Sequence, residues 1–279
     1  MTVVDETARP AGGSGASVAL AAGDGNRPLT VIAWDTSSPW CSVALVRYEQ
    51  AQPPSARRGT VLGEFLSAAG THSQMLPGQV QRLVAEAGLR PSDLGLVAVG
   101  RGPGSFTGLR TGLALAKGLA WGDGKPVLGI SSLEVAAASF LEETKSRDFL
   151  IAPVIDARHR QVFVALYQAA PEGEGYPLVP LLPPQPLTPE ELPAVLARAA
   201  AGRPTVLTGP ALELVTAAHP AGLPAPLSPA ARVITPLARA LADLAQMILI
   251  NEPTAAAIYP PIPMYIRQPD IRKSGLALT

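Results

Sequence analysis

Residues 94–121 read LGLVAVGRGPGSFTGLRTGLALAKGLAW, and this stretch decides the fold. The apolar run 94–99 predicts a buried strand, residues 100–104 form a glycine-rich turn, and residues 105–121 have the spacing of a helix. Glycines let the backbone approach a ligand closely, and the N-terminus of a helix favours anions. The stretch therefore predicts an α/β lobe of the nucleotide-binding type.

The turn lacks the sequence of the common phosphate-binding loops. No Gly-Lys-Ser or Gly-Lys-Thr follows its glycines, so it is not a P-loop, and it does not match the dinucleotide fingerprint. The chemistry of the lobe is incomplete by itself, which predicts an obligate partner subunit rather than a lone catalyst.

The residues before this stretch predict the rest of the lobe. Strands at 29–34 and 41–46 flank the turn Asp35-Thr-Ser-Ser, and residues 61–68 add a third strand. Apolar residues recur at helical intervals after Thr71, where Pro77 predicts a kink or a later start. A strand at 127–130 and a helix at 133–143 complete the lobe.

The second half repeats the pattern of strand, Asp turn and strand. Strands near 149–155 and 161–168 flank Asp156-Ala-Arg-His-Arg160, and Asp35 and Asp156 are each followed at the same offsets by Val-Ala-Leu. A proline-dense stretch then predicts an edge strand and a loop, Thr188 to Glu191 predict a helix start, and residues 205–208 and 235–250 predict a strand and a helix. We expect a disordered extension at 1–28, a first lobe at 29–147, and a smaller, degenerate second lobe at 148–279 with a Pro-rich loop at 171–193.

The composition excludes several classes of protein. Lys plus Arg and Asp plus Glu are both 22 in a chain of 279 residues, so no general attraction to nucleic acid is expected. A single cysteine excludes an internal disulfide and favours the cytoplasm, and no stretch has the roughly 18 apolar residues that a membrane helix needs. Asp5 and Glu6 stand where a signal peptide would be basic.

The Asp35 turn has two interpretations. Its backbone N–H groups and hydroxyls can face a phosphate while the carboxylate holds a hydrated Mg²⁺, or the Asp closes the hairpin as an Asx turn. The candidate nucleotide-facing residues are Asp35, Thr36, Ser37, Gly102 and Gly104.

Small residues recur at every fourth position of the predicted helix, at Gly108, Gly112, Ala116 and Ala120. Glycine in a helix costs about 1 kcal/mol relative to alanine, so the stripe implies compensating close packing, either within the chain or between subunits. Together with the apolar face of the preceding helix it gives a candidate partner interface: His72, Met75, Leu76, Val80, Leu83, Gly108, Leu109, Gly112 and Ala116.

Other reactive residues are scattered. His72, His159 and His219 form no metal-ligand pair, and Cys41 falls in a strand as a small core residue. Arg158 and Arg160 with His159 form either a basic patch or a solvated hairpin turn. No catalytic or metal-binding residue is predicted.

The chain resembles the TsaB (YeaZ) family, whose members are partner proteins in bacterial threonylcarbamoyladenosine modification of tRNA. The resemblance rests on a set of motifs: Asp35-Thr-Ser, Thr71-His-Ser, Leu76-Pro, Gly102-Pro-Gly-Ser-Phe-Thr-Gly-Leu-Arg-Thr-Gly112, Lys117-Gly-Leu-Ala, Ser131-Ser-Leu, Asp156-Ala-Arg and Tyr265-Ile-Arg. It implies the duplicated actin-like and sugar-kinase (ASKHA) α/β fold, with two lobes that each have a mixed sheet and helices.

The resemblance also implies partners. These are the catalytic relative TsaD in a heterodimer, the ATPase TsaE in a ternary complex, a homodimer when alone, and tRNA only through the complex, with no membrane. The family interface uses the helices after Thr71 and Ser105. TsaD holds a metal with paired histidines, whereas only His72 stands in the comparable region here. No cofactor is expected for the chain alone, and an adenine nucleotide at the partner interface stays open.

Two alternatives are kept beside the partner subunit. Asp35, Asp156 and the glycine turn would also suit a stand-alone ATPase or small-molecule kinase of the same fold class. The other alternative is a metalloprotease, but the sequence contains no zinc-binding motif.

Overall fold

The computed structural model describes residues 28–49, 59–68, 72–144, 146–171, 176–230, 237–251, 255 and 259–266, and only the backbone of 72–74. Within these residues the chain forms two five-stranded mixed sheets with helices, so the predicted α/β class with two sheets is confirmed. The extension predicted to be disordered lies outside the described residues, apart from Pro28, as do Thr71 and Arg267.

The first sheet contains the strands on both sides of the opening stretch, in the order β3-β2-β1-β4-β5. Its strands are β1 (Leu29–Asp35), β2 (Cys41–Tyr48), β3 (Thr60–Ser67), β4 (Leu96–Gly100) and β5 (Val127–Ile130). β1 pairs antiparallel with β2 and parallel with β4, so the hairpin and the crossover meet at the central strand.

The second sheet has the same arrangement, because its order β10-β9-β6-β7-β8 is that of the first sheet read from the other edge. Its strands are β6 (Leu150–Arg158), β7 (Gln161–Ala169), β8 (Leu178–Leu187), β9 (Thr205–Thr208) and β10 (Leu227–Pro229). β6 pairs antiparallel with β7 and parallel with β9, as β1 does with β2 and β4. The shared topology confirms the duplication that the two Asp turns predicted.

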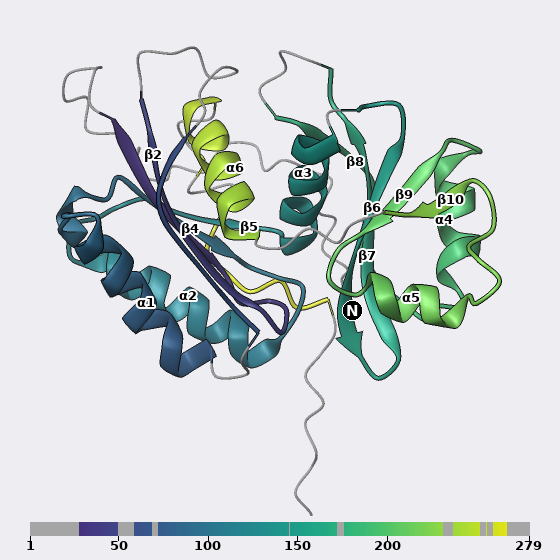
Figure 1. The fold of residues 1–279 in the computed structure, drawn as a ribbon, viewed down its shortest axis with the longest axis horizontal. Helices are drawn as coiled ribbons and strands as arrows, with labels where there is room; N and C mark the ends of the chain where they lie inside the picture. Colours follow the sequence, from purple (N-terminus) through teal and green to yellow (C-terminus); the bar gives the residue numbers. More distant parts are fainter. Residues whose placement is uncertain are drawn as a thin grey trace, which may run out of the picture.

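The helices form three layers around the two sheets (Figure 1). α1 and α2 cover the outer face of the first sheet, α3 and α6 lie between the sheets, and α4 and α5 lie on the far side of the second sheet. Their bounds are α1 (His72–Glu86), α2 (Phe106–Trp121), α3 (Ser132–Thr144), α4 (Leu192–Ala200), α5 (Leu212–Ala218) and α6 (Leu237–Asn251), with a short 3₁₀ helix at Pro91–Asp93.

Alternation along β1 explains how one strand serves two cores. Val31 and Ala33 belong to the core shared with α3, α6 and the second sheet, whereas Ile32 and Trp34 face the core beneath α1 and α2. Successive side chains of a strand point to opposite faces, so an unbroken apolar run marks a strand covered on both sides. β1 is buried along its whole length, as this arrangement requires.

Helix α6 returns from the second half of the sequence to the first sheet, where it contacts β1 and β2. The Tyr48 hydroxyl on β2 donates a hydrogen bond of 2.6 Å to Oδ1 of Asp243 on α6. The predicted division at residue 147 assigns α6 to the second lobe, because α6 follows the second sheet in the sequence. In the structure, however, α6 packs on the first sheet. The sequence pattern of α6 did not identify the sheet that it covers.

Two predictions for the second half, an edge strand and a capped helix start, agree with the structure. The prediction for Pro77 in the first half agrees less well. β8 is an edge strand, as its prolines predicted, and Thr188 and Glu191 exchange the hydrogen bonds of a capping box before α4. Pro77 left two alternatives open, a kink or a later start, and the later start is wrong, because α1 begins at His72 and contains Pro77. Pro77 lies in the second turn of α1, beyond the first four residues whose N–H groups have no partner in the helix, so it removes one hydrogen bond of the helix.

No helix among the described residues is long and apolar enough to cross a membrane.

We predict that Asp243→Asn stabilises the protein at neutral pH. Burial raises the pKa of Asp243, and Glu142 and Glu64 raise it further, against the hydrogen bond from Tyr48 and the charge of Arg239. A raised pKa in the folded state gives stability that is present below the unfolded pKa of about 3.9 and is lost as pH rises through the folded pKa. The amide of the variant mimics the neutral carboxyl group and keeps that stability.

Thermal unfolding from about pH 3 to about pH 8 checks this. The melting temperature of the variant should exceed that of the parent at the upper end of the range and converge with it at the lower end. A variant that is less stable than the parent at the upper end would contradict the assignment.

Candidate functional site

The Asp35 turn is closed by hydroxyl donors from two segments. Oδ1 of Asp35 accepts hydrogen bonds from the Ser37 backbone N–H at 2.9 Å and the Ser37 hydroxyl at 2.6 Å. Oδ2 accepts from the Ser132 hydroxyl at 2.6 Å, across 97 residues of sequence. Asp35 is only 2% exposed, so these donors replace water around a buried carboxylate.

The glycine-rich loop lies directly against this turn. The Ser105 backbone N–H donates to the Ser37 carbonyl oxygen at 2.6 Å. A Cβ on Gly104, whose φ is +154°, would lie 2.1 Å from the same oxygen, and one on Gly100 would lie 1.9 Å from Oδ2 of Asp35. The two glycines are needed for the contact between the loop and the Asp35 turn. The close backbone approach that they allow is therefore used for a contact within the chain.

Helix α2 begins on the same turn. Its N-cap is Ser105, whose side chain accepts from the Gly108 N–H. The Thr36 hydroxyl donates to the Gly108 carbonyl oxygen at 2.8 Å, and the Trp34 indole N–H donates to that of Gly112 at 3.1 Å. A Cβ on Gly108 would lie 2.1 Å from the Thr36 carbonyl oxygen.

The small-residue stripe therefore packs inside the chain, against the end of β1. Of the two explanations that the sequence left open, internal packing is the one that the structure shows for Gly108, Gly112 and Ala116.

The structure gathers the predicted nucleotide-facing residues in one place. Asp35, Thr36, Ser37, Gly102 and Gly104 all lie where the hairpin meets the glycine loop, but the hydrogen bonds of Asp35 and Ser37 are with each other, with Ser132 and with the loop. What the arrangement does in this structure is hold the hairpin, the loop and two helices together. A nucleotide-facing role for these residues stays a prediction.

Most of the predicted interface residues lie in the core of this chain, and their role as partner contacts stays a prediction. The buried ones are Leu76, Val80, Leu83, Gly108, Leu109, Gly112 and Ala116. Met75 is half-buried, and the side chain of His72 lies outside the described residues. The apolar face of each helix turns toward its own sheet, because that sheet supplies the nearest apolar surface.

The outward face of α2 carries different residues. Arg110, Ala114, Lys117 and Trp121 are exposed and follow one another at intervals of three or four, so they line one side of the helix. Trp121 is 89% exposed, which is rare for an aromatic side chain of this size.

A cluster at the start of α2 was missed by the sequence reasoning. The rings of Phe106 and Tyr265 lie with their centroids 5.2 Å apart, and the Arg110 guanidinium carbon lies 4.0 Å from the centroid of Phe106. Nε of Arg110 donates to the Tyr265 hydroxyl at 3.1 Å. Tyr265 stands in a motif of the resemblance, which was the available signal. Ser132 was also missed, although it lies in the motif Ser131-Ser-Leu.

The turn in the second sheet that corresponds to the Asp35 turn is built differently. One carboxylate oxygen of Asp156 accepts from the Arg158 backbone N–H at 2.7 Å, and the other pairs with the Arg158 guanidinium at 3.5 Å. Arg158, His159 and Arg160 are all exposed. Here the Asp bonds within its own turn, and none of the described glycines packs against its carboxylate.

Other candidate groups have structural surroundings. Cys41 is fully buried, and its burial, together with the charge of Asp35, raises the pKa of the thiol to about 11. The thiol therefore stays protonated at neutral pH and is a poor nucleophile. Nε2 of His219 lies 2.8 Å from the Pro189 carbonyl oxygen. In the described part of the chain, no group of three or more His, Cys, Asp and Glu could hold a metal ion.

Comparisons with known proteins relate the chain to tRNA modification proteins. A model of the family "TsaD: tRNA N6-adenosine threonylcarbamoyltransferase" matches residues 64–173. The TsaB biosynthesis protein of Bacillus subtilis is 37% identical over 141 residues, which are 50% of this chain and 56% of that protein. The TsaB protein of Escherichia coli is 35% identical over 145 residues, 52% of this chain and 58% of that one. The chain thus spans about half the length of the curated relatives it matches.

A solved structure, YeaZ from Pseudomonas aeruginosa, superposes with a TM-score of 0.65 and 26% identity, covering 85% of this chain and 99% of that one. The shared architecture extends beyond the half that aligns by sequence, and it confirms the predicted fold class.

We predict that Ser132→Ala lowers the free energy of unfolding by about 2–3 kcal/mol, because it leaves an oxygen of the buried Asp35 carboxylate without its donor. The matched control is Ser131→Ala. Ser131 is equally buried, but its hydroxyl has no hydrogen-bond partner in the described structure, so its loss should leave stability unchanged or higher. Urea unfolding of both variants measures this, and equal effects would refute the role of Ser132.

A second pair of variants tests the packing of α2. Gly108→Ala should destabilise by about 1–3 kcal/mol despite its better helix propensity, because the new Cβ would collide with the Thr36 backbone. Gly118→Ala in the same helix meets nothing within 4 Å and should stabilise by up to about 1 kcal/mol. Thermal and urea unfolding would show opposite signs for the two, and a stabilising Gly108→Ala would argue against internal packing of the stripe.

Proposed function

Because this chain is a relative of the TsaB (YeaZ) family, we propose that it is a non-catalytic partner subunit of the bacterial complex that makes N6-threonylcarbamoyladenosine at position 37 of tRNA, and that it binds and activates TsaD. TsaD supplies the transfer chemistry, TsaE joins as a third component, and tRNA is met only through the complex. The site of action is the cytoplasm, and the chain forms a homodimer when TsaD is absent.

The closed Asp35 turn is the observation that carries this proposal. A kinase or ATPase of this fold class needs a carboxylate that is free to hold a hydrated Mg²⁺ near the phosphates. Here both oxygens of Asp35 accept hydrogen bonds from Ser37 and Ser132, and the glycine loop lies against the turn. Because the Asp35 carboxylate is already engaged in this way, the structure favours a subunit in which this residue stabilises the fold. It argues against an enzyme that hydrolyses or transfers a nucleotide's phosphate.

The outward faces of α1 and α2 provide the surface for TsaD in this proposal. The core beneath them is filled by their inward residues, so each helix is held rigidly by the first sheet. Exposed Trp121 supplies a large apolar contact, and interface centres are enriched in such residues. Arg110 and Lys117 add positive charge on the same face. In this proposal an adenine nucleotide would bind at the interface with TsaD rather than at the closed Asp35 turn.

Variants of this outward face give a direct test. Ala114 lies at the middle of the exposed side of α2, and Ala114→Arg should abolish the heterodimer with TsaD while leaving the melting temperature nearly unchanged. The matched control is Ala194→Arg on α4, also exposed but on the second sheet. Gly112 and Leu76 would be unsuitable positions, since both are buried and their substitution would unfold the chain.

Light scattering of each variant mixed with TsaD, followed by measurement of threonylcarbamoyladenosine formation with TsaE, ATP and tRNA, checks this. The parent and Ala194→Arg should form the heterodimer and support modification, and Ala114→Arg should do neither. A parent chain that stays separate from TsaD, or that hydrolyses ATP without partners, would overturn the proposed role.

A further inference from the structure

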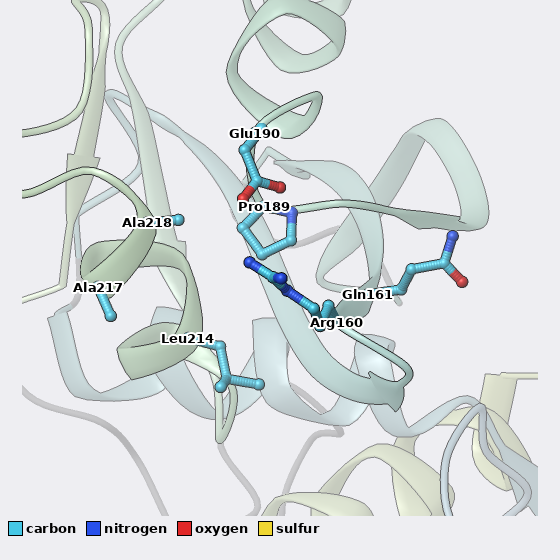
Figure 2. A pocket seen from close by; sticks show the side chains of 7 residues that line it. All are labelled: Arg160, Gln161, Pro189, Glu190, Leu214, Ala217 and Ala218. Atoms are coloured by element: carbon cyan, nitrogen blue, oxygen red, sulfur yellow. The ribbon is translucent and has the colours of Figure 1, made fainter.

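A pocket in the second half of the chain lies apart from the Asp35 turn (Figure 2). Its volume is about 260 Å³. The lining residues come from the β6–β7 turn, the segment before α4, and α5: Arg160, Gln161, Pro189, Glu190, Leu214, Ala217 and Ala218. The volume lies below the range of roughly 300–1,000 Å³ that is typical of sites for drug-sized ligands, so the pocket suits a small molecule.

The β6–β7 turn directs Arg160 into this pocket at a conformational cost. Three successive residues, Arg158, His159 and Arg160, have φ values of 62°, 49° and 59°. Each non-glycine residue in the left-handed region costs on the order of 1 kcal/mol, and such strain clusters at functional sites. In Figure 2 the Arg160 side chain extends toward Pro189, between the Glu190 segment and the helix that carries Leu214, whereas Gln161 points away.

The segment before α4 forms the opposite wall of the pocket, and its hydrogen bonds do not involve the Glu190 side chain. The Thr188 hydroxyl and the Glu191 carboxylate form the capping box, so Glu191 rather than Glu190 is the residue used for the helix start. His219 binds the Pro189 carbonyl oxygen and fixes the segment to the end of α5. Within the part of the chain that the structure describes, neither Arg160 nor Glu190 has an ion-pair or hydrogen-bond partner for its side chain.

The third wall is apolar. Leu214, Ala217 and Ala218 come from α5, and Leu214 is 47% exposed, so part of its surface is uncovered beside the pocket. The pocket therefore presents one cation, one anion and a small apolar wall, all without partners in the described structure.

We propose that this pocket binds a free α-amino acid with a small aliphatic side chain. The Arg160 guanidinium pairs with the ligand carboxylate in a charge-assisted, two-pronged hydrogen bond. Glu190 accepts from the ligand ammonium group, and Leu214 with the two alanines contacts the aliphatic side chain. A phosphate or other dianion is disfavoured, because Glu190 would repel it. This inference stands independently of the function proposed above.

Both charged groups are exposed to solvent, which limits the strength of each ion pair. We therefore expect a dissociation constant on the order of 1 mM.

Calorimetric titration of the full chain with L-valine tests the proposal. L-valinamide, which lacks the carboxylate, and N-acetyl-L-valine, which lacks the ammonium group, are the ligand controls, and inorganic phosphate is a third. Arg160→Gln and Glu190→Gln should each weaken valine binding about tenfold or more. The matched controls are Arg198→Gln on α4 and Glu213→Gln on α5, both exposed and outside the pocket, which should bind as the parent does.

Circular dichroism before each titration establishes that the variants are folded. Binding of valine but neither derivative, lost in the two pocket variants and kept in the two controls, supports the proposal. It is overturned if valine gives no heat up to about 10 mM, if valinamide or phosphate binds as well as valine, or if folded Arg160→Gln binds valine normally. None of these outcomes depends on TsaD.

Discussion

The carboxylate of Asp35 is buried, and the first half of the structure is organised by the need to satisfy it. A buried carboxylate is costly unless hydrogen-bond donors replace its water. Ser37 supplies two donors from the same turn and Ser132 supplies one from the start of α3. The second oxygen can be reached only because Gly100 has no side chain. Strand β1, the glycine loop and α3 are thereby fixed relative to one another.

The two halves of the chain share a strand order but use their Asp turns in opposite ways. In the first half, the turn is covered by the glycine loop and by α2, whose glycines allow the backbones to touch. In the second half, Asp156 bonds to Arg158, and the following basic residues stay exposed in a strained turn. Duplication thus produced one packed joint that supports the α1 and α2 surface, and one open turn beside a pocket.

The sequence predicted most strands and helices and the duplication correctly. It did not predict which segments pack against one another. Strand β5 and the start of α2 were located correctly because glycines and the change of apolar period mark their ends. The same periodicity shows that Gly108 or Leu76 lies on an apolar face, but not whether the chain or a partner covers it. Ser132 and α6 act on segments 97 and 195 residues away, through contacts that no local pattern encodes.

We propose that Asp35 stabilises the fold of a partner subunit and does not hold a nucleotide's metal ion. The most direct measurement compares Asp35→Asn with the parent in both melting temperature and activation of TsaD in threonylcarbamoyladenosine formation. We expect a lower melting temperature, because an uncharged amide accepts hydrogen bonds from the Ser37 and Ser132 donors more weakly than a carboxylate does, and its NH₂ group cannot accept one. We also expect full activation of TsaD at temperatures where the variant is folded. An unchanged melting temperature with activation lost would contradict this structural role of Asp35.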